Sequence, residues 1–423
     1  MKFFHALKIR LLFPPKSVLI AGLSFRLICA LAFADLHSDY YWEYGEIAKN
    51  VISGKGYSFR AFSGDTMIDR YREGLSPLPT AFMSPGYVWV LIPFIALRNS
   101  VVANILLILL QTLLSMATIV LVYHFTRAMF NPRAALFSAI AAALMPDVVY
   151  AVISFSPTVF YHAGVIILLL LIGNGKSESP RLHIFLVSVL CAVLIFFRFE
   201  FVLYVFLIAL LLALERRAKE SIVIVMTTIC FILPWSARNY EVFGEMVPLG
   251  TGAGLNLYRG NNAENIGSWG NEKTNRELLR IPRDKRFELA LDSLFREEAW
   301  DFVRKEPKRE AELVAVKVGQ LWLFSPLHPT PYNLVYVAAS SLAFILFFVG
   351  LLVTWHWAKY KYLYMFLLYS TILAMIFFAL PRHQTMMRIG MLPFIGAGVD
   401  ALMTYFSRPA KLGLERQKTL EGR

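Results

Sequence analysis

The fold of this chain is decided by a stretch that carries no charged side chain, SVVANILLILLQTLLSMATIVLVY (residues 100–123). An α-helix rises about 1.5 Å per residue, so about 20 such residues cross the apolar layer of a bilayer. Comparable apolar runs recur along the whole chain of 423 residues, of which 57% are hydrophobic and 17% charged. A soluble chain carries more charge than this. The composition therefore predicts an all-α integral membrane protein.

The apolar runs predict about ten membrane-spanning helices. Some are shorter than a lone spanning helix requires, so tilt, local thinning or mutual packing is expected there. The expected spans are residues 17–34, 100–123, 134–146, 149–172, 183–197, 201–214, 221–235, 332–355, 362–380 and 389–406.

The net charge of +13 follows this topology. Basic residues gather in short segments between spans and at the chain ends, whereas acidic and basic residues nearly balance in segments 35–85 and 236–329. With ten spans, both termini and every basic cluster fall on the cytoplasmic side, as the positive-inside rule requires. The charge therefore indicates orientation and gives no reason to expect a nucleic-acid partner. The absence of an Asn-x-Ser/Thr sequon favours a bacterial plasma (inner) membrane.

Two long segments outside the spans are expected to organise the chain. The run from Ser84 to Leu97 is too short to cross, and it predicts an interfacial helix with Tyr87 and Trp89 at headgroup depth. Two more helices are predicted at 285–305 and 307–324. The expected parts are a membrane module at 1–235 with a first extracytoplasmic loop at 35–99, an extracytoplasmic segment at 236–330, C-terminal transmembrane helices at 331–406 and a basic cytoplasmic tail at 407–423.

Arg26 interrupts the first apolar run. A cation there is either buried and functional or reaches toward the interface along its flexible stem, and we favour the second interpretation. Ala32-Phe33-Ala34 imitates a signal-peptidase site, but the charge within the apolar core favours a retained helix.

Polar side chains gather in three places at the predicted outer ends of the spans. The first is DLHSDYYWEY (residues 35–44), where an ionised Asp39 can take a proton from a hydroxyl group, or can instead cap the following helix. The second runs from Pro234–Tyr240 to GTGAGLNLYRGNN (residues 250–262), whose glycine-rich turn suits hydrogen bonding to a sugar or phosphate, or is an ordinary tight turn. The third holds Arg382 and Arg388, with Arg198 and Glu200 at another span end. Arginine binds phosphate bidentately, although interfacial anchoring accounts for many arginines there.

These clusters, in this order, resemble the C-type membrane glycosyltransferases that use polyprenyl-phosphate sugars, in particular the bacterial branch related to protein mannosyltransferases and the lipid A aminoarabinose transferase. Five groups of residues carry the likeness. They are Asp39 with Tyr44, Ala48, Gly54 and Gly56-Tyr57-Ser58; Ser84-Pro85-Gly86-Tyr87; Phe197-Arg198-Phe199-Glu200; and Pro234-Trp235 through Arg238-Asn239, Phe243-Gly244, Gly254–Leu257 and Gly260-Asn261-Asn262, with Arg388 through Pro393 at the end. Asp39 stands five residues before Tyr44, where the family acid is commonly four before.

The resemblance implies transfer of a sugar from a polyprenyl phosphate to lipid A or core, a glycan or a protein hydroxyl, with Asp39 as general base. It leaves open a divalent cation on loop carboxylates. The donor phosphate is expected to contact Arg198, Arg238, Arg382 and Arg388. The sugar or acceptor is expected to contact Glu43, Tyr44, Tyr87, Glu200, Asn239, Asn256, Tyr258, Asn261 and Asn262.

Two other classes explain many spans equally well. A lipid-linked sugar flippase or transporter usually has internal repeats, short loops and polar groups near the bilayer midplane, and none is evident here. A polysaccharide polymerase or ligase usually carries its large loop late in the chain. The expected first loop at 35–99 favours the transferase over both.

Overall fold

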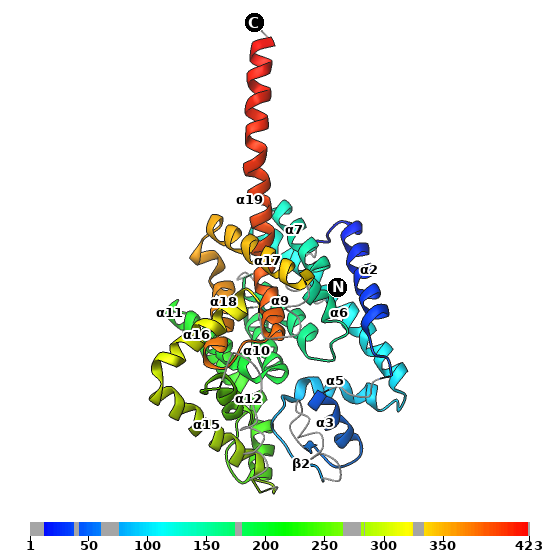
Figure 1. Cartoon of the computed structure of the whole chain (residues 1–423), viewed down its shortest axis with the longest axis vertical. Helices are drawn as coiled ribbons and strands as arrows, with labels where there is room; N and C mark the ends of the chain where they lie inside the picture. Colours follow the sequence, from blue (N-terminus) through cyan, green and yellow to red (C-terminus); the bar gives the residue numbers. More distant parts are fainter. Residues whose placement is uncertain are drawn as a thin grey trace.

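The structure is a computed structural model in which residues 12–37, 42–60, 76–173, 180–264, 281–282, 284–324 and 334–421 are described. Almost all of the regular secondary structure in these residues is helical (Figure 1). The exception is a two-stranded antiparallel pairing of β1 (Ser58–Phe59) with β2 (Leu78–Pro79). The predicted all-α membrane fold is confirmed.

Six helices in the described part are long and apolar enough to cross a bilayer. They are α2 (Lys16–Phe33), α6 (Ser100–Met129), α10 (Pro180–Phe197), α12 (Ala218–Phe243), α17 (Leu334–Val353) and residues Pro381–Ser407 of α19 (Pro381–Glu421). Shorter apolar helices are α5 (Pro85–Ile95), α7 (Pro132–Leu144), α9 (Thr158–Gly173) and η1 (Phe199–Phe201) continued by α11 (Val202–Leu214). A further helix, α18, runs from Trp357 to Ile376. The chain is a multi-pass membrane protein, and the count of ten spans stays a prediction.

Several predicted spans have different bounds in the structure; for example, α19 begins at Pro381 and not at residue 389. The run at 149–172 is broken, because α8 (Pro146–Tyr150) ends in a turn and α9 starts only at Thr158. Proline 157 and the hydroxyl groups of Ser154 and Ser156, which bond to one another at 3.1 Å, interrupt the helix there. In contrast, α12 runs past the expected end at 235 to Phe243 and stops at Gly244, whose φ is +72°.

Helix α19 occupies the middle of the bundle, where it packs against α7 and α17. A Cβ atom at Gly396 would lie 2.2 Å from the Ala134 carbonyl oxygen, and one at Gly398 would lie 2.0 Å from the Leu346 carbonyl oxygen. Glycine therefore lets the three backbones approach more closely than any other residue would, as in membrane helix pairs generally.

A layer of shorter elements covers one end of the bundle, opposite the end from which α19 projects (Figure 1). It contains α3 (Trp42–Ile52), the β1–β2 pair, α5, α13 (Ala253–Gly260), α15 (Phe287–Lys305) and α16 (Pro307–Trp322). The helices predicted at 285–305 and 307–324 are thus confirmed within a few residues. Tyr87, predicted at headgroup depth beside Trp89, is instead fully buried, whereas Trp89 is exposed.

Candidate functional site

Five predicted site residues come together near the junction of the bundle and this layer. We call them the charged cluster: Glu43 and Tyr44 of α3, Arg198 and Glu200 between α10 and α11, and Arg382 of α19. Arg198 donates from Nε to Glu200 Oε1 at 2.6 Å. Arg382 interacts electrostatically with Glu43, Tyr44, Arg198 and Glu200. Three distant parts of the sequence therefore meet at one charged site.

Local backbone structure explains how the two arginines are presented. Helix α10 ends at Phe197, and Arg198 has an extended backbone (φ −150°, ψ 106°) before the 3₁₀ turn η1 begins. Arg382 follows Pro381, the first residue of α19, where the fixed φ of proline favours the start of a helix. The side chain of Arg382 stays exposed to solvent. Two guanidinium groups beside the N-terminus of a long helix provide donors for an anion, while Glu43 and Glu200 balance their formal charge.

Aromatic side chains form one wall beside the charged cluster. The Tyr44 and Tyr87 rings meet edge to face at 5.3 Å, and Tyr87 also contacts Phe160 at 5.9 Å. Burial raises the pKa of Tyr44, and nearby Arg198 opposes that shift. Tyr44 therefore keeps its hydroxyl proton at neutral pH and is a hydrogen-bond donor at the site.

Arg238, predicted to contact the donor phosphate, connects α12 to the β1–β2 pair in this structure. Its guanidinium donates to the Thr80 carbonyl at 2.7 Å and to the Tyr57 carbonyl at 2.8 Å. It also lies 5.4 Å and 5.3 Å from the ring centroids of Tyr57 and Trp235. The neighbouring Asn239 is fully buried and donates to the Val247 carbonyl at 3.0 Å. Asn239 therefore orders the segment that leads into α13, while Arg238 holds the β1–β2 pair.

Glu288 of α15 anchors the same region, and it was not among the predicted site residues. Its buried carboxylate accepts hydrogen bonds from the Ala81 N–H at 2.9 Å, from the Thr251 hydroxyl at 2.6 Å and from the Thr80 hydroxyl. Burial raises the pKa of Glu288, while these bonds and Arg238 oppose the rise. Only the acidic character of Glu288 within a helical stretch was readable from the sequence, and this does not distinguish an anchor from a solvated charge.

The predicted asparagines after α13 hold that helix against its neighbours. Asn261 donates to the Ile376 carbonyl of α18 at 2.8 Å and accepts from Lys317 Nζ of α16 at 2.6 Å. Asn262 donates to the Tyr258 carbonyl at 2.7 Å, and Tyr258 is buried against Phe295. Burial lowers the pKa of Lys317, and nearby Glu310 opposes this shift.

Asn256 is the remaining predicted residue of this loop, and it is half-buried in α13. The part of α13 before it is closely packed, because a Cβ at Gly254 would lie 1.9 Å from the Asp292 carbonyl oxygen. The glycine-rich stretch therefore serves close helix packing as well as any ligand contact.

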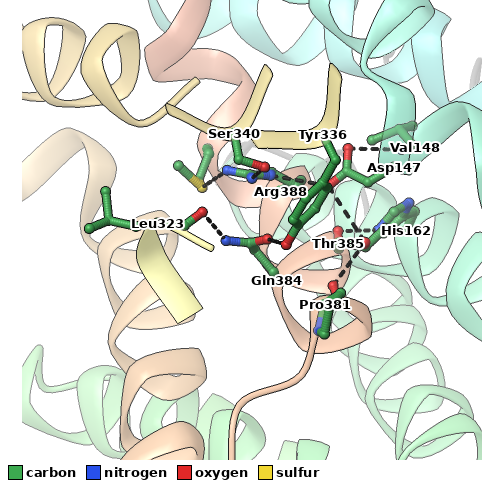
Figure 2. A network of polar contacts seen from close by, with 11 residues as sticks. Asp147, Val148, His162, Leu323, Tyr336, Ser340, Pro381, Gln384, Thr385 and Arg388 are labelled. Carbon is green, nitrogen blue, oxygen red and sulfur yellow. Dashed lines mark hydrogen bonds and ion pairs between the residues drawn. The ribbon is translucent and has the colours of Figure 1, made fainter. Parts of the chain in front are cut away.

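Arg388 lies in a separate buried network, which Figure 2 shows. It is fully buried, and its Nε donates to Asp147 Oδ2 at 3.2 Å while Nη2 donates to the Ser340 hydroxyl at 2.9 Å. The backbone carbonyl of Thr385 bonds to His162 Nε2 at 2.8 Å. Asp147 was not among the predicted site residues, because the hydropathy placed it in the short connection between the expected spans 134–146 and 149–172.

Asp39, the predicted base, lies outside the described residues, between His37 and α3. Among the described residues, no group of three His, Cys, Asp or Glu side chains is placed to hold a metal ion.

Comparison with known proteins gave one family match. The family model "Dolichyl-phosphate-mannose-protein mannosyltransferase" matches residues 83–236, which include Tyr87, Arg198 and Glu200. A search of curated proteins found no match. The resemblance to protein mannosyltransferases predicted from the sequence is thus confirmed over this part of the chain.

Solved structures share the fold. The archaeal oligosaccharyltransferase AglB from Archaeoglobus fulgidus, in complex with an inhibitory peptide and a dolichol-phosphate, has a TM-score of 0.53 at 12% identity over 94% of this chain and 51% of its own. The apo oligosaccharyltransferase of the same organism has a TM-score of 0.54 with the same identity and coverage. ArnT from Cupriavidus metallidurans bound to undecaprenyl phosphate has a TM-score of 0.38, too low to establish a common fold, at 13% identity over 91% and 77%. The chain spans about half the length of the oligosaccharyltransferases it matches.

Proposed function

We propose that this protein is a membrane glycosyltransferase that moves a sugar from a polyprenyl phosphate to a hydroxyl group of an envelope acceptor. The observation that carries the proposal is the charged cluster, in which Arg198 and Arg382 stand beside carboxylates at the junction of the bundle and its covering layer. A lipid-borne phosphate can reach this junction from the bilayer, while a polar acceptor arrives from the aqueous side. The family match over residues 83–236 supports the same activity.

The leaving group determines what the arginines do. In an inverting transfer the acceptor oxygen attacks the anomeric carbon, the carbon–oxygen bond to the phosphate breaks, and the phosphate keeps the electron pair. Arg198 and Arg382 stabilise the negative charge that develops on the departing phosphate, as preorganised donors do in other transferases. Arg238 already donates to two backbone carbonyls, and Arg388 already donates to Asp147. We therefore assign these two arginines to positioning the surrounding helices.

The acceptor hydroxyl must lose its proton during the attack. We assign this proton to Asp39, since a carboxylate with a pKa near 3.9 is ionised at neutral pH, and positioned base catalysis contributes about 10²- to 10⁴-fold in rate. Glu43 of α3, four residues further along the chain, and Tyr44 orient the sugar or acceptor hydroxyls. Glu200, bonded to Arg198, fixes that guanidinium for the phosphate.

Several finer assignments complete the proposal. The site faces the extracytoplasmic side of a bacterial plasma membrane, with both termini in the cytoplasm, because the basic clusters lie at the chain ends and in the short connections. Lipid A or its core, another glycan and a protein hydroxyl are the acceptor classes. Mass spectrometry of glycolipids and envelope glycans from a deletion strain identifies which of them loses a sugar.

The test uses the purified full chain in sealed proteoliposomes with sugar-labelled undecaprenyl phosphate, and with envelope lipids and glycans from the deletion strain as acceptors. Transfer releases free undecaprenyl phosphate, and we expect Asp39→Asn to abolish most of that release while the protein is still made. A flippase would move the labelled lipid across the membrane without consuming it. Lipid movement without release by the wild-type protein would therefore refute the proposal.

A further inference from the structure

Arg26 is a fully buried cation in the first membrane helix, α2. The prediction that its side chain reaches toward the interface is wrong. Its Nη1 donates to the Ala143 carbonyl and its Nη2 to the Ala142 carbonyl, each at 3.0 Å, while Nε donates to the Ser115 hydroxyl of α6 at 2.9 Å. These acceptors are neutral and come from two neighbouring helices. Arg26 is therefore built into the interior of the bundle.

The carbonyls that Arg26 binds belong to the last turn of α7. That helix has 13 residues, or about 20 Å at 1.5 Å per residue, which is shorter than the apolar layer of a bilayer. Its Ala142 carbonyl would bond to the N–H of residue 146 in a continued helix, but residue 146 is a proline and has none. A carbonyl without a partner at membrane depth is costly, and a cation also complements the negative end of a helix. Arg26 thus makes it possible for α7 to end inside the bundle.

The chain turns at this point and presents Asp147. We call residues 144–147 the elbow between α7 and α8. Asp147 accepts from Arg388 Nε of α19 at 3.2 Å, and its other oxygen accepts from the Val148 N–H at 2.9 Å (Figure 2). Both Arg26 and Asp147 interact electrostatically with the buried His162, so the two charges belong to one polar region.

We infer that Arg26 is a positioning residue: it fixes the elbow, the elbow holds Arg388 through Asp147, and Arg388 fixes the part of α19 that begins with Arg382. The α2 helix packs closely against the end of α7 directly before the elbow, since a Cβ at Gly22 would lie 3.2 Å from the Ala143 Cβ. A lysine presents its donors from one nitrogen atom and cannot reproduce the fork that reaches Ala142, Ala143 and Ser115 together. The effect on donor binding rests on the proposed function, whereas the effect on α19 does not.

The experiment compares Arg26→Met and Arg26→Lys with Lys359→Met in the full chain. Lys359 is a matched control, because it also donates to a carbonyl at a helix C-terminus, that of Met129 in α6. Hydrogen exchange is measured at residues 145–150 and 381–388. We expect Arg26→Met to accelerate exchange in both segments, Arg26→Lys to do so less, and Lys359→Met to change neither. Wild-type exchange at 381–388 in folded Arg26→Met would overturn the inference. If Arg26→Met does not fold, the same comparison is made with Arg26→Lys.

Undecaprenyl phosphate then probes the consequence for the site. We expect its affinity, measured by thermal shift, to fall at least about fivefold in Arg26→Met, the size of a typical coupling between sites. The double variant Arg26→Met/Asp147→Asn should lose no more affinity than the worse of the two single variants, since both substitutions act through the elbow. Additive losses would refute the shared route. Failure of the wild-type protein to bind this lipid would refute the proposed function alone, because the exchange result stands without it.

Discussion

Arg238 allows the clearest calculation of what one side chain contributes. We expect Arg238→Met to remove the two bonds to the Thr80 and Tyr57 carbonyls and the contacts with two aromatic rings. The Tyr57 carbonyl keeps a second donor, the Thr80 N–H at 3.1 Å, whereas the donor to the Thr80 carbonyl is Arg238 itself. A charge-assisted hydrogen bond contributes about 1.5–3 kcal/mol and an exposed cation–π contact about 0.5–1 kcal/mol. Since these terms overlap, we expect a loss of about 2–4 kcal/mol.

The assay is thermal unfolding of the purified protein in detergent, with undecaprenyl phosphate added in a second series. Arg238→Lys is the companion variant, because one ammonium group cannot reach both carbonyls with the same geometry. If Arg238 positions α12 and the β1–β2 pair, both variants lose stability, and the remaining folded protein is still stabilised by the lipid phosphate. Wild-type stability together with complete loss of lipid binding would refute this reasoning and assign Arg238 to the phosphate itself.

Three further predictions follow from the described contacts. Gly260→Ala should destabilise the protein strongly, because a Cβ would lie 1.8 Å from the Phe377 carbonyl oxygen. Gly319 has open space around it, so Gly319→Ala should raise stability by up to about 1 kcal/mol. Thermal unfolding of the two variants tests both expectations. Glu288 has a raised pKa, so its contribution to stability falls as pH rises above about 4.5, and Glu288→Gln should gain relative to wild type between pH 4.5 and 7 in the same assay. Arg198→Lys should lower the rate of donor turnover without lowering expression, since it loses the fork that binds Glu200.

The charged cluster was predictable because its members are polar side chains beside apolar runs. Arg198, Glu200 and Arg382 all lie at helix ends, where hydropathy marks the boundary to within a few residues. Their meeting with Glu43 and Tyr44 required the resemblance to a known family, because spacing in the sequence does not show which helix ends are neighbours.

Other features could not be predicted, because their partners are backbone groups or are distant in the sequence. Arg26 binds the carbonyls of Ala142 and Ala143, and although Pro146 shows from the sequence that the Ala142 carbonyl has no helical N–H partner, the sequence does not show which side chain supplies the donor. An arginine suits a phosphate and a backbone carbonyl equally, so the sequence did not show that Arg238 binds the carbonyls of Tyr57 and Thr80. The break between α8 and α9 escaped hydropathy, because Ser154 and Ser156 lie in an otherwise apolar run.

The central claim is that Arg382, at the start of α19, faces the phosphate that leaves during transfer. The most direct measurement is the rate of undecaprenyl phosphate release by Arg382→Met in the same proteoliposomes, with Arg309→Met, a partly exposed arginine paired with Glu312 on α16, as the control. We predict a fall of about 10²- to 10³-fold for Arg382→Met, the effect of removing one donor to a developing negative charge, and an unchanged rate for the control. Wild-type release by Arg382→Met would contradict the account.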